Sequence, residues 1–234
     1  MVGFQRARSA EQREVRRRAI LDTAAAMLAE MPVADVSLNE LSRRVGLAKS
    51  NVLRYFDSRE AVLLELLDDA TREWLVALAA GLSRVDAGAS LAQRCAAVAV
   101  VVAETLADRP VLNDLVGAQA AVLERNVSPA VAAHFKRVGM AKLDAAAQLV
   151  LGPVPELGER SAQHFAGGVA LVAGALWAHG QPSAALEAAY AADPELAALR
   201  LDARDALTEL VEVLLRGWLA ISPSPSGGAS GSGP

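Results

Sequence analysis

The 234-residue sequence has one cysteine, Cys95, and only 4% aromatic residues. A single cysteine forms neither an internal disulfide nor a cysteine-based metal cluster, which fits a reducing cytoplasm. The scarcity of aromatic residues disfavours a β-sandwich or barrel. Charged or polar residues break every apolar stretch before it reaches the roughly 20 residues of a membrane span, and the first residues lack the apolar segment of a signal peptide. We therefore expect a cytoplasmic protein that is not inserted in a membrane.

Alanine, in contrast, is abundant, with 50 residues in a chain that is 53% hydrophobic. Alanine is the best helix former, so the composition predicts an all-α fold. Arginine outnumbers lysine 20 to 3, which together with the alanine excess suggests a high-GC coding sequence. Part of the alanine content then reflects genomic bias, and the all-α prediction depends more on helix caps and apolar stripes.

The net charge of −4 is distributed unevenly. Residues 1–60 carry +3 and residues 61–234 carry −7. A basic segment of this kind suits contact with phosphates, although a solvated helix face has the same composition. The arginines of the first 18 residues are Arg6, Arg8, Arg13, Arg16, Arg17 and Arg18.

About nine helices are expected from apolar spacing and from Gly, Pro, Ser and Asp punctuation. A loop with one short helix is expected over residues 181–201. The expected helices cover about 10–31, 38–45, 48–55, 58–82, 90–107, 110–125, 128–151, 156–180 and 202–220.

Local signals mark several of these helix ends. Ser37 and Glu40 have the spacing of a capping box, and Gly46 suits the left-handed position after a helix. Ser58 is a candidate N-cap, and Ser128 precedes a proline at the first helical position.

Two short helices joined through Gly46, with a basic helix before them, have the outline of a helix-turn-helix. In the second helix, Lys49 and Arg54 suit guanine edges or phosphates, and Asn51 suits adenine. An ordinary surface hairpin of helices in an all-α protein is the alternative interpretation.

The segment SLNELSRRVGLAKSNVLRYFDSREAVLLELL resembles the DNA-binding core of the TetR (tetracycline repressor) family of bacterial regulators. The resemblance extends over about residues 10–67. It implies that Ser37 binds a phosphate at a helix start, that Arg59 contacts the DNA backbone, and that Leu53 stands where a tyrosine is usual, where it offers an apolar contact instead. The positions implied to face bases or groove walls are Lys49, Ser50, Asn51, Arg54 and Tyr55.

The resemblance implies the domain organisation, and the small, polar composition of the last residues predicts a disordered tail. We expect a flexible basic arm at 1–9, the helix-turn-helix domain at 10–57, a ligand-binding and dimerisation domain at 58–221 and a disordered tail at 222–234. A pocket in the larger domain would take a mainly apolar small molecule, oriented by Gln119 and His134. For each of these residues taken singly, plain core is the favoured interpretation. The predicted lining is Trp74, Leu78, Val101, Leu112, Leu115, Gln119, His134, Phe135, Val138 and Leu171.

The last two long helices are the predicted dimer interface, because both carry an apolar face and the first also has a row of small residues. A monomer core is the alternative. The predicted interface residues are Phe165, Gly168, Val172, Trp177, Leu207, Val211, Leu214 and Trp218.

These patterns predict a homodimeric repressor that binds a palindromic operator in double-stranded DNA and is released by a small molecule. A ligand-independent regulator or an activator with the same helix-turn-helix is the alternative. An enzyme is disfavoured, since the sequence has no glycine-rich phosphate loop, nucleophile elbow or framed carboxylate pair. No cofactor is expected, and the three histidines lack partners at zinc-site spacing, so no metal is expected either.

Overall fold

The structure is a computed structural model that describes residues 2–221, with side chains described from residue 11 onward. Over this range the chain forms eleven α-helices and no strand, which confirms the predicted all-α fold. The helices are α1 (Val2–Glu30), α2 (Leu38–Val45), α3 (Lys49–Val52), α4 (Arg59–Leu82), α5 (Leu91–Ala107), α6 (Pro110–Ala118), α7 (Pro129–Leu151), α8 (Glu159–His179), α9 (Ala184–Ala192), α10 (Pro194–Ala197) and α11 (Ala203–Ile221). Shorter helical turns are η1 (Val33–Asp35), the π-helical η2 (Gln119–Leu123) and η3 (Pro155–Leu157).

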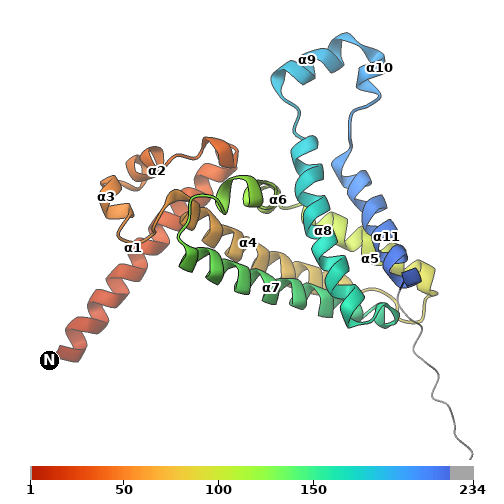
Figure 1. The fold of residues 1–234 in the computed structure, drawn as a ribbon, viewed down its shortest axis with the longest axis horizontal. Helices are drawn as coiled ribbons and strands as arrows, with labels where there is room; N and C mark the ends of the chain where they lie inside the picture. Colours follow the sequence, from red (N-terminus) through yellow and green to blue (C-terminus); the bar gives the residue numbers. More distant parts are fainter. Residues whose placement is uncertain (1, 222–234) are drawn as a thin grey trace, which may run out of the picture.

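The helices form two groups that α4 connects (Figure 1). Helices α1, α2 and α3 form one end, and α4 runs from them through the molecule with α7 packed beside it. At the other end α5, α8 and α11 pack together, while α6 lies between α4 and α8. The pair α9 and α10 projects from the body between α8 and α11, and we call it the α9–α10 projection.

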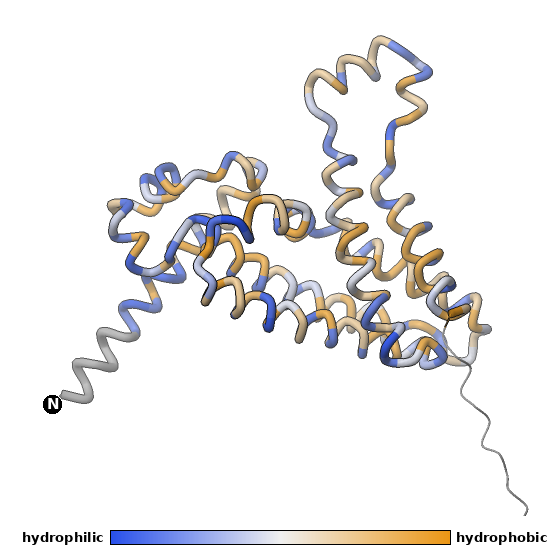
Figure 2. The backbone as a smooth tube through the Cα atoms, in the orientation of Figure 1, coloured by the Kyte–Doolittle hydropathy of each residue, from blue (hydrophilic) through white to orange (hydrophobic). Residues whose placement is uncertain are grey.

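The apolar core runs through both groups of helices. Figure 2 shows hydrophobic positions concentrated along α4, α5, α8 and α11, whereas the described part of α1 is largely hydrophilic along its outer half. In the first group Ile20, Leu41 and Val52 are fully buried and hold α1, α2 and α3 together. In the second, Phe165 and Leu215 are buried between α5, α8 and α11.

Four of the predicted caps form. The hydroxyl oxygens of Ser37, Ser58 and Ser128 each accept a hydrogen bond from a backbone N–H three residues later, and Gly46 adopts the left-handed conformation with φ 71°. Only one of the two hydrogen bonds of the predicted capping box at Ser37 forms. The Glu40 carboxylate accepts hydrogen bonds from Arg43 and Arg44 instead of from the Ser37 N–H.

Several boundaries differ from those predicted. Helix α1 begins at Val2 where residue 10 was expected, and α3 ends at Val52, so Arg54 and Tyr55 lie in the turn after it. The helix predicted over 110–125 is α6 followed by the π-helical turn, and residues 181–201 hold two helices where one was expected. Ser183 and Asp193 cap these two, accepting from the backbone N–H of Leu186 and Glu195. The predicted tail at 222–234 lies outside the described residues.

Within residues 2–221 no helix is long and apolar enough to span a membrane.

Candidate nucleic-acid interface

The short helix α3 is positioned by buried residues on either side of its exposed face. Val52 and Phe56, four residues apart, are buried against the core of the first helix group. The Gly46 turn between α2 and α3 is closed by a hydrogen bond from the Leu47 N–H to the Ser42 carbonyl, 3.0 Å apart. This arrangement leaves Lys49, Ser50, Asn51, Leu53 and Arg54 exposed, as the helix-turn-helix prediction requires.

A cleft lies between α1 and α3 and joins two sets of polar side chains. Gln12, Arg13 and Arg16 of α1 line it together with three predicted DNA-contact residues. Those three are Asn51, Arg54 and Tyr55. Gln12, Arg13 and Arg16 were not among the residues predicted to face bases or groove walls. The run of arginines in the sequence had nevertheless indicated contact with phosphates.

The arginines of α2 are paired with carboxylates. Arg43 and Arg44 both donate to Glu40, at 2.6 and 2.8 Å, and Arg44 also pairs with Glu30 of α1 at 2.7 Å. Hydrogen bonds from Arg43 and then Arg44 lower the pKa of Glu40 to about 2. This cluster fixes α2 on α1 and leaves α3 and the α1 arginines as the exposed basic groups of the cleft.

Ser37 remains exposed at the start of α2, where its hydroxyl accepts the Glu40 N–H at 3.1 Å. The backbone N–H groups of this first turn suit an anion, which is the role predicted for Ser37.

Arg59 makes contacts within the protein. Its Nη2 donates to the Val33 carbonyl at 3.3 Å, and its Nε lies 3.5 Å from the Glu60 carboxylate. These contacts hold η1 against the start of α4 and leave the Arg59 side chain 20% exposed, so its contact with the DNA backbone stays a prediction.

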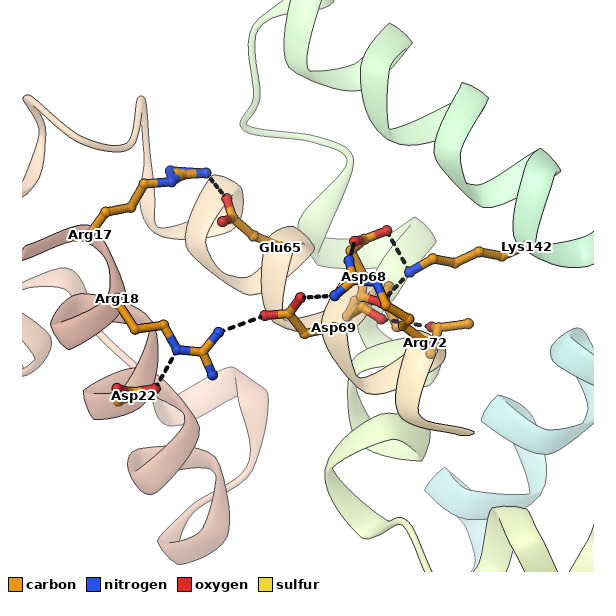
Figure 3. Close-up of polar contacts among 10 residues, drawn as sticks. Arg17, Arg18, Asp22, Glu65, Asp68, Asp69, Arg72 and Lys142 are labelled. Carbon is orange, nitrogen blue, oxygen red and sulfur yellow. Dashed lines mark hydrogen bonds and ion pairs between the residues drawn. The ribbon is translucent and has the colours of Figure 1, made fainter. Parts of the chain in front are cut away.

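Charged side chains also join the first helix group to α4 and α7 (Figure 3). Arg17 pairs with Glu65, and Arg18 bridges Asp22 at 3.0 Å and Asp69 at 3.5 Å. Desolvation is the main cause that raises the pKa of Glu65, against the attraction of Arg17.

On the far side of α4, Asp68 continues this set of charges. Its carboxylate bonds both Arg72 of the same helix and Lys142 of α7, each at 2.5 Å. The cluster thus runs from α1 across α4 to α7 and ties the exposed end of the molecule to its body.

Two more hydrogen bonds connect the helix-turn-helix with the body. The Asp114 carboxylate of α6 accepts the Val33 N–H at 2.7 Å, and Ser128 at the start of α7 donates to Asp57 at 3.3 Å. Movements of α6 and α7 can therefore reach the segments before α2 and before α4.

The ten residues predicted to line a ligand pocket differ in burial. Leu78, Leu112 and Leu115 are buried in the core, whereas Leu171 is 77% exposed and His134 is exposed. Neither Leu171 nor His134 faces the interior, so the prediction that they line a buried pocket is corrected.

The remaining predicted pocket residues are half-buried and packed among neighbours. Trp74 donates its indole N–H to Thr105 at 3.1 Å, and Gln119 donates to Glu124 at 2.7 Å. A cavity lies elsewhere, beside α6, α8 and the start of α11, and none of the ten residues lines it. The other half-buried residues among the ten are Val101, Phe135 and Val138.

The residues predicted to form the dimer interface also differ in burial. Phe165, Leu207 and Val211 are buried within the subunit, so they are not available to a second copy. Trp177 lines the cavity. Val172 is half-buried against the core. Gly168, Leu214 and Trp218 are half-buried where α8 and α11 meet.

Metal-binding groups are not gathered in the described part of the chain, where no cluster of three or more His, Cys, Asp or Glu side chains could hold an ion. Cys95 is buried, and desolvation raises the pKa of its thiol.

Comparisons with known sequences agree with this arrangement. Residues 20–66 match the family described as bacterial regulatory proteins, tetR family, and residues 68–222 match a tetracyclin repressor-like C-terminal domain. The regulators EthR of Mycobacterium tuberculosis and Mycobacterium bovis are 40% identical over 70 residues, which is 30% of this chain and 31% of theirs. The match thus spans just under a third of these curated relatives.

Solved structures share the fold at low identity. The fatty acid degradation regulator FadR from Bacillus halodurans has a TM-score of 0.52 at 16% identity, over 85% of this chain and 93% of that one. A TetR regulator from Rhodococcus sp. RHA1 has a TM-score of 0.51 at 17% identity, over 87% and 97%. With both parts of the chain matched, the protein belongs to the TetR family of helix-turn-helix transcriptional regulators.

Proposed function

We propose that this regulator is a homodimeric repressor, acting in the cytoplasm, that binds a palindromic operator and leaves it when a small molecule binds. The observation that carries the proposal is the cleft in which Arg13 and Arg16 of α1 adjoin Asn51, Arg54 and Tyr55. In this proposal the arginines bind phosphates and the α3 side reads bases, and a sequence-specific DNA site needs both.

The proposed contacts differ in kind. Asn51 and Lys49 are placed to reach base edges in the major groove, whereas Arg13 and Arg16 suit the phosphates beside it. Leu53 is 42% exposed and offers its side chain to a thymine methyl group. Ser37 and the α2 start supply a phosphate contact.

Dimerisation is proposed through the outer side of α8 and α11. Leu214 lies 3.6 Å from where a side chain on Gly168 would begin, and the rings of Trp218 and His164 are 4.8 Å apart, so these faces adjoin. Apolar groups around these contacts are exposed, including Leu171 at 77%. We define the α8–α11 surface as Gly168, Leu171, Leu210, Leu214, Trp218 and Ile221.

A second copy on the α8–α11 surface would complete a four-helix bundle and give two α3 helices related by a two-fold axis. Such a dimer suits two half-sites about one helical turn, roughly 34 Å, apart.

The test is selection of bound sequences from random DNA, followed by measurement of binding stoichiometry. We expect an inverted repeat bound by two chains, with transcription from a promoter containing it reduced in a purified system. Selection without sequence enrichment at low salt would contradict the operator. A single half-site bound by one chain would contradict the homodimer, and increased transcription would identify an activator.

A further inference from the structure

Arg17 of α1 lies in a different place from its neighbours Arg13 and Arg16. Those two are exposed and line the cleft beside α3. The Arg17 side chain is 30% exposed and pairs with the Glu65 carboxylate of α4 (Figure 3). Its guanidinium carbon lies 4.5 Å from the centre of the Phe56 ring, in the segment after α3. One side chain of α1 therefore contacts both the segment after α3 and the helix that follows it.

The Phe56 ring anchors the segment that carries two residues of the cleft. Arg54 and Tyr55 stand between Val52, which is fully buried, and Phe56, which is 4% exposed. The backbone N–H groups of Tyr55 and Phe56 donate to the Val52 carbonyl, at 2.9 and 3.2 Å. The place of the Phe56 ring therefore fixes where Arg54 and Tyr55 meet the cleft.

Arg17 connects the two walls of the cleft. The wall from α1 ends at Arg16, directly before Arg17, and the opposite wall ends at Tyr55, directly before Phe56. A guanidinium over an aromatic ring face is attracted by the charge distribution of the ring. The ion pair with Glu65 keeps the guanidinium over the ring, so a single side chain sets the separation of the two walls.

Glu65 depends on this cation. The carboxylate is 31% exposed, and burial raises its pKa. The charges of Glu14, Asp68 and Asp69 repel that of Glu65, whereas Arg17 attracts it. An ion pair in the open gains little from holding two long side chains together, but a partly buried carboxylate among like charges is costly without its partner. The pair is therefore suited to hold a fixed geometry.

We propose that Arg17 is a positioning residue of the DNA site, which contacts no DNA itself and keeps the two walls of the cleft at the separation that base reading requires. This rests on the proposed function for the role of the cleft. Base-edge hydrogen bonds need side chains placed within about 0.5 Å, whereas attraction to phosphates acts over about 10 Å at 0.1 M salt. Loss of Arg17 therefore reduces discrimination between sequences more than binding to DNA in general.

The experiment compares operator affinity with affinity for random DNA, by fluorescence anisotropy on the full chain at several salt concentrations. Arg17→Ala should lower the ratio of the two affinities at least about fivefold, in line with the loss of a partly desolvated cation–ring contact. Arg18→Ala is the matched control, because it loses the same charge one position later. The Arg18 side chain is 63% exposed and pairs with Asp22 and Asp69. Its loss should leave the ratio within about twofold of the wild type.

A double-mutant cycle separates positioning from charge. Glu65→Ala should also lower the ratio, because it releases Arg17 from the Phe56 ring. The double variant Arg17→Ala/Glu65→Ala should fall no further than either single variant, since both remove one contact. A charge effect gives the opposite pattern. Glu65→Ala would then strengthen binding to all DNA, and the double variant, whose net charge equals that of the wild type, would bind as the wild type does.

Circular dichroism and thermal melting establish that each variant is folded at the temperature of the titrations. Arg17→Gln and Glu65→Gln replace any alanine variant that is not, with the same direction of change expected. An unchanged ratio in Arg17→Ala, an equal fall in Arg18→Ala, or the charge pattern in the cycle would overturn the proposal. So would a salt dependence lower in Arg17→Ala than in Arg18→Ala, which would show a phosphate contact.

A measurement without DNA distinguishes failure of this proposal from failure of the proposed function. Amide exchange over residues 53–56 should accelerate in Arg17→Ala and stay at the wild-type rate in Arg18→Ala, because only Arg17 covers the Phe56 ring. Equal exchange in the two variants would overturn the positioning role. If random DNA yields no operator, the proposed function fails while the exchange result stands.

Discussion

The carboxylate of Asp114 accepts a hydrogen bond from the backbone N–H of Val33, which is 81 positions earlier in the chain, with 2.7 Å between the two atoms. Arg59 donates to the carbonyl of the same Val33 residue at 3.3 Å. The turn η1 is therefore held on one side by α6 and on the other by α4. Because η1 immediately precedes α2, these bonds fix the orientation of the helix-turn-helix on the body.

The first prediction concerns this bond. Asp114→Ala leaves the N–H of the buried Val33 without its acceptor and should lower the free energy of unfolding by about 1–3 kcal/mol. Asp114→Asn is the matched control, because the amide oxygen still accepts and stability should stay closer to the wild type. Chemical denaturation gives the free energies, and amide exchange at Val33 should accelerate in the alanine variant alone. Unchanged exchange there would show that the bond does not hold η1.

The second prediction concerns the packing of α6 on α8. A Cβ at Gly174 would lie 3.0–3.1 Å from backbone atoms of Gly117, so the helices must separate to admit it. Gly174→Ala should destabilise the fold by about 1–3 kcal/mol. Gly139→Ala, on α7 with no atom within 4 Å of the new Cβ, should instead stabilise by up to about 1 kcal/mol. Melting of the two variants side by side tests the contrast, and equal shifts would contradict the close approach.

The third prediction separates the two kinds of DNA contact. Arg16→Ala should weaken all sequences alike and reduce the salt dependence by about one unit of slope, because one phosphate contact is lost. Asn51→Ala should reduce discrimination at one base pair by about 1–3 kcal/mol. Anisotropy titrations on matched and single-mismatch operators at several salt concentrations give both quantities. Identical profiles of the two variants would contradict their assigned roles.

The fourth prediction is a pH dependence at α2. The ordinary pKa of a glutamate is near 4.5, and the hydrogen bonds from Arg43 and Arg44 lower that of Glu40 to about 2 in the folded chain. The stability that these bonds supply is therefore present above about pH 4.5 and is lost as the pH falls toward 2. Glu40→Gln should flatten the decline in this window, measured by chemical denaturation across pH. A Glu40 carboxyl titrating near 4.5 by NMR would show that the cluster is absent in solution.

The fifth prediction tests the α8–α11 surface. Leu171→Arg places a charge at the proposed interface and should convert the proposed dimer to a folded monomer in sedimentation experiments. Val76→Arg is the control, because Val76 of α4 is 70% exposed, close to the 77% of Leu171, but lies outside that surface. A dimer that persists in Leu171→Arg, or dissociates equally in Val76→Arg, would place the interface elsewhere.

Much of the DNA-binding end was predictable because its signals are local. The Ser37 cap and the Gly46 turn act through atoms a few residues apart, and the exposure of Lys49 and Asn51 follows from the burial of Val52. Side-chain partners were less predictable, because more than one partner lies within reach. Glu40 bonds Arg43 and Arg44 in place of the Ser37 N–H, and Arg59 bonds the distant carbonyl of Val33.

The sequence by itself therefore determined the helices, their caps and the helix-turn-helix, since helical periodicity and capping depend on residues within a turn or two. Only the tertiary structure decided which apolar faces meet. Leu207 and Val211 have the same spacing whether they bury against α5 and α8 or against a second copy, and they are buried within the chain. The Asn113 side chain of α6 likewise finds its partner only after packing, because its Nδ2 donates to the Leu106 carbonyl at the end of α5.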